Sequence, residues 1–252
     1  MSTGAVDQRR RLSAAFRPRN YVALARMLRT FADPADALRR YVTSRGEFPW
    51  TARLRTPLGP IALTIPHPHD VRTLNEVFCR QDYGSERPRV VVDIGGNIGL
   101  TAVYFLTRRP DSRVYVFEPV PNNLNTLRAN VSAFADRCVV SEQAVGVTGG
   151  VAEFLVEPVG RYGGLREYTR GDYDFTVISV PCLTIADALR QVLHTEGSID
   201  LVKIDTEGSE EALVAAIPDD VWPRIGEVAY ERAGGVVQLA SPLRSEGGGR
   251  GG

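Results

Sequence analysis

Four acidic residues between positions 93 and 231 each follow a short apolar run. Asp93 closes "RVVVD", Glu118 closes "VYVFE", Asp205 closes "LVKID" and Glu231 closes "VAYE". In open α/β sheets, ligands bind at the edge formed by the carboxyl ends of the strands. Carboxylates there accept hydrogen bonds from hydroxyl or ammonium groups, act as bases, or hold a cation. The spacing therefore predicts a ligand site at one edge of a sheet.

A glycine-rich turn follows the first of these acids, in the sequence "DIGGNIGL" at 93–100. Glycines let a ligand approach the backbone, and the helix that follows offers free N–H groups. The turn does not match the GxGxxG spacing of dinucleotide sites. Asp93 beside the turn suits a cofactor with positive groups, such as S-adenosylmethionine, and disfavours a pyrophosphate. A nucleotide-dependent oxidoreductase stays an alternative, because such enzymes also place an acid where Glu118 stands.

The segment "KIDTEGSE" at 203–210 is expected to face the reacting centre. Asp205, at the strand end, is a candidate base, or a ligand of Mg²⁺ together with Glu231. Lys203 and Asp205 share one face of the strand, so an ion pair between them is expected. Glu207 is a further catalytic candidate; its alternative role is to stabilise the N-terminus of the next helix.

The elements that must position these residues alternate between strand and helix. Such alternation predicts a mostly parallel sheet with helices on both faces. Two runs, 151–156 and 175–180, break the alternation and predict an antiparallel pair. We expect core strands at 90–92, 113–117, 138–142, 199–204 and 225–230. We expect one helix that follows the glycine turn and ends near 108, and three further helices at 121–131, 184–194 and 209–217.

Five segments of the chain, taken in sequence order, resemble the FkbM family of S-adenosylmethionine-dependent methyltransferases. The resemblance covers residues 52–231 and implies a Rossmann-like class I methyltransferase fold. It also implies methyl transfer to a hydroxyl of a small molecule, such as a sugar or natural-product intermediate. The five segments are "VVVDIGGNIGLTAVYF", "VYVFEPVPNNLNTLRANV", "SEQAVG", "VPCLTIADAL" and "IDLVKIDTEGSEEALV".

The resemblance also implies roles for single residues. Glu118 would hold the cofactor ribose, and the residues after the third strand would border the adenine. A helix cap is the alternative for Asn123, and a surface turn is the alternative for Gln143. The implied catalytic residues are Asp205, Glu207 and Glu231. The implied cofactor residues are Asp93, Gly95, Gly96, Asn97, Gly99, Glu118, Pro119, Asn123, Gln143 and Ala144.

The expected organisation is a helical arm over 1–50, a hairpin and helix over 51–88, the methyltransferase domain over 89–235 and a flexible tail over 236–252. This glycine-rich tail is expected to leave the sheet shortened, with no obvious outer neighbour for strand 225–230. An open strand edge favours a homo-oligomer, unless the tail folds across it. The missing strands also support an alternative function, that of an inactive methyltransferase-fold protein acting as a binding or assembly partner.

The amino-acid composition limits the kinds of binding partner and the cellular location that we expect. Among 252 residues, Lys and Arg number 30 and so do Asp and Glu, so no net charge draws the molecule to nucleic acid or membrane. Three scattered cysteines favour reduced thiols and a cytoplasmic location. His67 and His69 in "HPHPHD" are expected in a solvated loop rather than at a metal.

Overall fold

The computed structural model describes residues 18–84, 87–157, 163–169, 174–232 and 236–240, and the side chains of 18–20, 231–232 and 236–240 are not described. The chain separates into two compact units, residues 1–84 and 85–252. No helix among the described residues is long and apolar enough to cross a membrane.

The first unit packs helices around a hairpin. Strands β1 (Trp50–Thr56) and β2 (Gly59–Ile65) pair antiparallel, which confirms the predicted hairpin. The Asp33 carboxylate accepts a hydrogen bond from the Asp36 N–H at 3.0 Å and caps helix α3 (Pro34–Thr43). His67 and His69 lie in the turn before helix α4 (Asp70–Asn75), and their rings stack at 5.3 Å. The helical elements are α2 (Pro18–Thr30), α3 (Pro34–Thr43), α4 (Asp70–Asn75) and the π-helical turn η1 (Glu76–Arg80).

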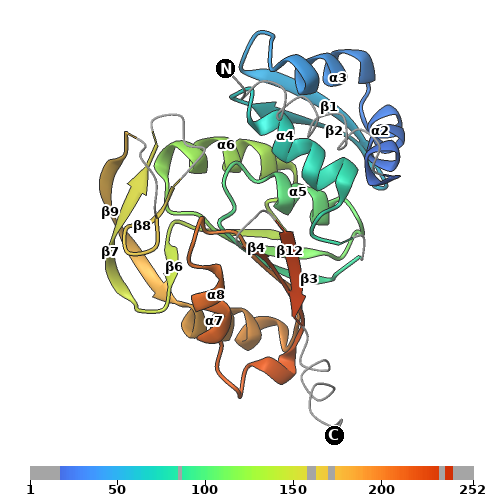
Figure 1. Ribbon diagram of the computed structural model, residues 1–252. Helices are drawn as coiled ribbons and strands as arrows, with labels where there is room; N and C mark the ends of the chain where they lie inside the picture. The colour runs from blue at the N-terminus through green and yellow to red at the C-terminus, as the bar shows by residue number, and fades with distance from the viewer. Residues whose placement is uncertain (1–17, 85–86, 158–162, 170–173, 233–235, 241–252) are drawn as a thin grey trace, which may run out of the picture. The chain divides into compact units, whose positions relative to one another are not determined.

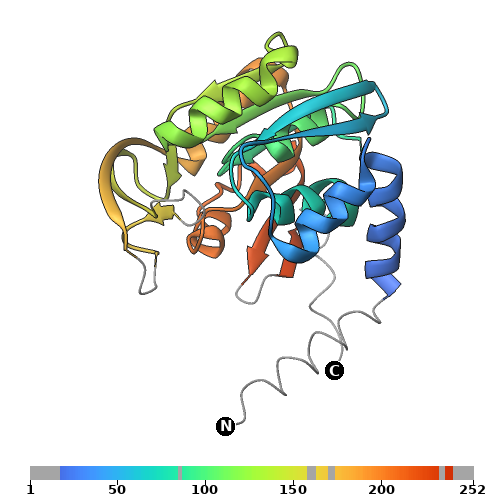
Figure 2. The ribbon, with the colours of Figure 1, turned by 90° about the horizontal axis from the view of Figure 1, so that it is seen from above.

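The second unit is built on a six-stranded sheet in the order β12-β11-β10-β3-β4-β5. Strands β3, β4 and β12 of this sheet are labelled in Figure 1, and Figure 2 shows the same ribbon turned by 90°. All neighbours run parallel except β11 and β12. The mostly parallel α/β fold that the sequence predicts is therefore confirmed. The strands are β3 (Val90–Ile94), β4 (Arg113–Phe117), β5 (Cys138–Ser141), β10 (Ile199–Ile204), β11 (Ile225–Arg232) and β12 (Val236–Ala240).

Helices cover both faces of this sheet (Figure 1). Helices α5 (Leu100–Leu106) and α6 (Pro121–Val131) lie on one face. Helices α7 (Ile185–Glu196) and α8 (Glu210–Ala215) lie on the other face, in one apolar core with Val90, Val92 and Ile94 of β3. Because side chains alternate along a strand, Asp93 points to the opposite face from Val92 and Ile94. The helix ends lie within two residues of the predicted ones.

A second, four-stranded sheet in the order β6-β9-β7-β8 follows β5 along the chain. Strands β7 and β9 pair antiparallel, from Gly150 opposite Cys182 to Val156 opposite Thr176, as the sequence predicts. A small core of Ala144, Leu165, Val180 and Cys182 fills one face of this sheet. The strands are β6 (Ala144–Gly146), β7 (Gly150–Val156), β8 (Gly163–Leu165) and β9 (Thr176–Thr184).

One prediction about the C-terminal region is wrong. Val236–Ala240 lies in the predicted flexible tail but forms β12, which pairs antiparallel with β11 over five residues; residues 241–252 of that tail lie outside the described part of the chain. Strand 225–230 therefore has an outer neighbour, and the alternative that the tail folds across it is confirmed for 236–240. Its backbone groups are paired within the chain, so the open-edge argument for self-association loses its basis.

Candidate active site

The parallel register brings the predicted acids to one edge of the sheet. Asp93 lies in β3 opposite Lys203 of β10, and Glu118 and Asp205 follow the last residues of β4 and β10. Glu231 follows Tyr230, which pairs with Ile204, so its backbone lies beside that of Asp205. The Glu231 side chain is outside the described part of the chain. The edge that sequence reasoning predicts is therefore present, and its centre is a lysine.

The ammonium group of Lys203 joins three segments of this edge. Its Nζ lies 3.0 Å from Asp93 Oδ1 and 3.4 Å from Asp205 Oδ2, and it donates a hydrogen bond to the Gly95 carbonyl oxygen at 2.7 Å. The predicted Lys203–Asp205 ion pair is thus confirmed. The Lys203 and Asp93 side chains are 3% and 0% exposed, whereas Asp205 keeps 28% of its side chain exposed. Of the two carboxylates paired with Lys203, Asp205 is therefore the one that a second molecule can reach.

The charges at Lys203 are strongly coupled. Burial is the largest single influence on its pKa and lowers it, but the carboxylates of Asp93 and Asp205 together raise the pKa to about 12. Burial raises the pKa of Asp93, and the Lys203 ammonium opposes that shift. A buried ion pair of this kind is weak evidence for stability, because desolvation offsets much of the attraction. The ion pairs of Lys203 matter here because they hold the glycine turn and the Asp205 segment in fixed positions relative to each other.

The glycine turn packs directly against that segment. Gly95 has φ +78°, and a Cβ atom on it would collide with the Asp205 carbonyl oxygen. The Asp205 N–H also donates to the Ile94 carbonyl oxygen at 3.1 Å. Gly96 and Gly99 complete the turn, and Gly99 is the residue before helix α5. The turn thus needs glycine where it meets the neighbouring strand end.

Glu118 holds the other side of the turn. Its Oε2 accepts a hydrogen bond from the Asn97 N–H at 2.8 Å, and its Oε1 accepts from the Val120 N–H at 2.9 Å and from Asn123 Nδ2 at 3.3 Å. Burial raises the pKa of Glu118, and these hydrogen bonds oppose the shift. Asn123 is therefore a partner of Glu118, and helix α6 has no side-chain cap. Sequence reasoning missed this tie, because it depends on the spacing between β3 and β4.

The remaining predicted cofactor residues lie beside or after β4 and β5. Pro119 is buried next to Glu118, and Gln143 is half-buried after β5. Ser141 Oγ donates a hydrogen bond to Gln143 Oε1 at 3.0 Å, so Gln143 is not a plain surface turn. Ala144 begins β6 and belongs to the small core of the second sheet.

The loop at 205–209 is shaped by Glu210, a residue outside the predicted catalytic set. Glu210 is buried, and its carboxylate accepts hydrogen bonds from the Thr206 N–H at 2.8 Å and the Gly208 N–H at 2.9 Å. Glu207 is exposed and has φ +57°. The sequence places Glu210 in the first turn of a helix. This pattern predicts a role at the helix N-terminus and does not predict contacts with the preceding loop.

Backbone strain in the second unit gathers at this edge. Among its described residues other than glycine, positive φ occurs at Asn97, with +47°, and at Glu207, with +57°. Conformations of this kind persist where the surroundings hold them, often at functional sites. Asn97 is held by Glu118 and the Glu207 loop by Glu210. Both residues thus stand near the carboxyl ends of the strands, where the predicted acids meet.

The atoms at this edge suit a ligand that donates hydrogen bonds or carries positive charge. The two Asp93 oxygens accept no hydrogen bond from the described residues, although Oδ1 is paired with Lys203. Glu118 and Asp205 also present acceptors only. Glu118 and Asp205 therefore suit a ligand whose facing atoms are hydroxyl or ammonium donors, whereas Asp93, with its side chain 0% exposed, adds negative charge behind the turn. Within the described ranges, no three His, Cys, Asp or Glu side chains form a group that could hold a metal ion.

Comparison with known proteins identifies the family. The FkbM methyltransferase domain model matches residues 93–225, which is more than half of the chain. The 31-O-demethyl-FK506 methyltransferase FkbM of Streptomyces tacrolimicus is 31% identical over 212 residues, and the match covers 71% of this chain and 80% of that protein.

Two further relatives share less of their length. The AMB antimetabolite synthetase AmbE of Pseudomonas aeruginosa is 31% identical over 63% of this chain, which spans only 9% of that protein. A solved methyltransferase FkbM from Methylobacillus flagellatus KT is 16% identical, with a TM-score of 0.39 over 65% of this chain and 43% of that one. The family match and the sheet topology carry the assignment: this chain is a class I methyltransferase fold and belongs to the FkbM methyltransferase family.

Proposed function

We propose that this protein is an S-adenosylmethionine-dependent O-methyltransferase that acts on a hydroxyl of a small molecule, such as a sugar or a natural-product intermediate. The observation that carries the proposal is the turn at 93–99, which Glu118 and Lys203 fix from two sides. A turn lined with buried carboxylates favours a positively charged cofactor. The oxidoreductase alternative is disfavoured by the same charges and by the glycine spacing.

The proposed cofactor site uses the predicted residues. Glu118 has two oxygens with about four acceptor positions, of which three are filled by the chain, so it can accept one hydroxyl donor from a ribose. Gly95 and Asn97 are partly exposed and offer backbone at the turn, while Gln143 and Ala144 border the neighbouring strand end. When bound, S-adenosylmethionine supplies a methyl group that is already activated by the sulfonium, so the protein's main task is orientation.

Asp205 is the proposed acceptor-side group. Its carboxylate is partly exposed at the strand end and can take a proton from a hydroxyl or orient that hydroxyl. Glu207 and Glu231 are proposed as its neighbours on the acceptor side. The relative from Streptomyces tacrolimicus, named for methylating 31-O-demethyl-FK506, supports an oxygen acceptor. Mg²⁺ between Asp205 and Glu231 is a separate hypothesis, which turnover with and without EDTA decides.

Binding and turnover test the proposal in sequence. Calorimetry should give saturable binding of S-adenosylmethionine and S-adenosylhomocysteine, and no binding of NAD⁺. Mass spectrometry should then detect methyl transfer to members of a panel of hydroxylated compounds that includes 31-O-demethyl-FK506. Tighter binding of NAD⁺ would overturn the cofactor assignment. Cofactor binding without turnover on any acceptor would favour the inactive binding protein; β12 supplies the outer neighbour of β11 and so removes the missing-strand argument for that alternative.

A further inference from the structure

The loop that carries Asp205 and Glu207 touches the second sheet through backbone atoms. Gly164 of β8 is buried, and a Cβ atom built on it would lie 2.9 Å from the Thr206 carbonyl oxygen. On the facing loop, Gly208 has φ +127°, and its Cβ would lie 2.9 Å from the Tyr168 carbonyl oxygen. Real Cβ contacts essentially never reach such distances. Glycine on both sides therefore allows the two segments to touch.

The β8 side of this contact is firmly held by its own sheet. Leu165 pairs with Phe154 of β7 and belongs to the small core. After β8 the chain makes a helical turn, in which the Tyr168 and Thr169 N–H groups donate to the Leu165 carbonyl oxygen at 2.9 and 3.0 Å. The Tyr168 side chain packs on the same core. A packed sheet thus backs the surface that meets the loop.

The loop side is held from the opposite direction. The Glu210 carboxylate accepts the Thr206 and Gly208 N–H groups, and Thr206 Oγ1 lies 2.7 Å from Ser209 Oγ. Glu207, between these donors, has a left-handed backbone that needs such support. The segment from 206 to 208 is therefore fixed between Glu210 and β8, directly after Asp205.

We infer that β8 and the turn after it form the acceptor-side wall of the active site, with Gly164 as a positioning residue for the loop that carries Asp205 and Glu207. The inference rests on the proposed function, since it assigns a wall to that same site. Methyl transfer depends on orientation, and a shift of about 1 Å in a positioning segment can lower the rate by about 100-fold. Cofactor binding should not depend on Gly164, because the turn at 93–99 is tied by other residues.

Three variants test the inference. Gly164→Ala places a Cβ 2.5 Å from Thr169 Oγ1 as well as 2.9 Å from the Thr206 oxygen. The double variant Gly164→Ala/Thr169→Ala removes the first clash and keeps the clash with the loop. Gly149→Ala is the matched control, because its Cβ meets nothing closer than 3.4 Å, an ordinary contact, in the turn before β7.

Hydrogen exchange, calorimetry and turnover should separate these variants. We expect faster amide exchange at 205–209 in both Gly164 variants, with unchanged affinity for S-adenosylmethionine. We also expect kcat/KM for the best acceptor of the panel to fall at least ~10-fold. Gly149→Ala should match the wild type in all three measurements.

Wild-type exchange at 205–209 in the double variant would overturn the inference, and so would an equal loss of turnover in Gly149→Ala. Failure of both Gly164 variants to fold would assign the contact to stability and overturn the positioning role. If the wild type transfers no methyl group, the proposed function fails, while the exchange comparison still decides whether β8 holds the loop.

Discussion

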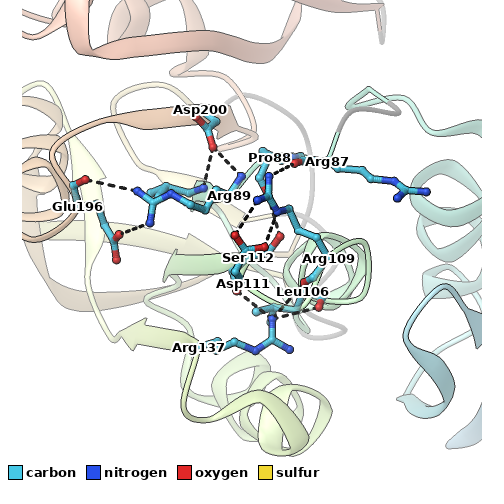
Figure 3. A network of polar contacts seen from close by, with 11 residues as sticks. Arg87, Pro88, Arg89, Leu106, Arg109, Asp111, Ser112, Arg137, Glu196 and Asp200 are labelled. Atoms are coloured by element: carbon cyan, nitrogen blue, oxygen red, sulfur yellow. Dashed lines mark hydrogen bonds and ion pairs between the residues drawn. The ribbon is translucent and has the colours of Figure 1, made fainter.

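The central sheet holds charge differently at the carboxyl ends of its strands (the carboxyl edge) and at their amino ends (the amino edge). At the carboxyl edge, one buried ammonium of Lys203 is shared by Asp93, Asp205 and a carbonyl oxygen of the glycine turn. At the amino edge, arginines and carboxylates form the network drawn in Figure 3, and several of its arginines stay partly exposed. The first arrangement buries charge beside strained backbone, whereas the second pairs charge near solvent.

The amino edge satisfies backbone groups and joins strands. Asp200 accepts the N–H groups of Arg89 and Val90 at 2.6 and 3.0 Å, which ties β10 to the start of β3 (Figure 3). Glu196, at the end of α7, pairs with Arg89 at 3.0 Å and with Arg113 at 2.7 Å. These contacts lie on the same sheet as the proposed cofactor site but at the other ends of the strands. Polar groups that join strands and polar groups of the proposed site are thus separated along the strands.

The largest expected effect is at Lys203. Lys203→Met leaves Asp93 buried without its cation, and breaking a buried pair in this way costs about 3–5 kcal/mol of unfolding free energy. Urea denaturation measures the loss. The double variant Lys203→Met/Asp93→Asn should recover part of the stability, because it removes both charges. A single variant as stable as the wild type would show that the carboxyl edge does not depend on this ammonium.

Glu118 should matter for the cofactor. Glu118→Ala removes the acceptor of the Asn97 and Val120 N–H groups, so affinity for S-adenosylmethionine should fall by about 1–3 kcal/mol. Calorimetry measures the change. Glu142→Ala is the control, since Glu142 lies exposed just after β5 and pairs with Arg128 on the surface. Equal affinities in the two variants would remove Glu118 from the binding site.

Glu196 tests the amino edge alone. Its carboxylate is 7% exposed and is shared by two arginines and the Tyr115 hydroxyl, which donates at 2.8 Å. Glu196→Gln should lower the unfolding free energy by about 1–2 kcal/mol, because it weakens charge-assisted hydrogen bonds. Affinity for S-adenosylmethionine should stay that of the wild type. A weakened affinity would mean that the two edges are coupled.

The smallest effect concerns pH. Burial raises the folded-state pKa of Glu118 above its ordinary value of 4.5. Relative to Glu118→Gln, which does not titrate, the wild type should be most stable below pH 4.5 and should lose that advantage as pH rises through the folded pKa. Thermal melts of both proteins across this range measure the difference. An advantage that grows with pH would contradict the direction of the shift.

Sequence reasoning predicted that the acids meet at the carboxyl ends of the strands, but not the contacts between them. Apolar runs that end in Asp93, Glu118 and Asp205 identify strand ends, and the two-residue period of a strand predicted the Lys203–Asp205 pair. Lys203 and Asp93 lie on different strands and are 110 residues apart in the sequence. Only the register of β3 against β10 brings these two residues together. Strand β12 was missed because its short apolar run "VVQLA" is surrounded by glycine and polar residues, which indicate a loop.

We propose that S-adenosylmethionine binds at the carboxyl edge and not at the amino edge. Hydrogen exchange with and without S-adenosylhomocysteine, resolved by peptide, distinguishes the two edges. We expect slower exchange at 95–99 and 118–123, and unchanged exchange at 109–113 and 196–200. Protection confined to the amino edge, or none at 95–99 when the ligand is saturating, would contradict it.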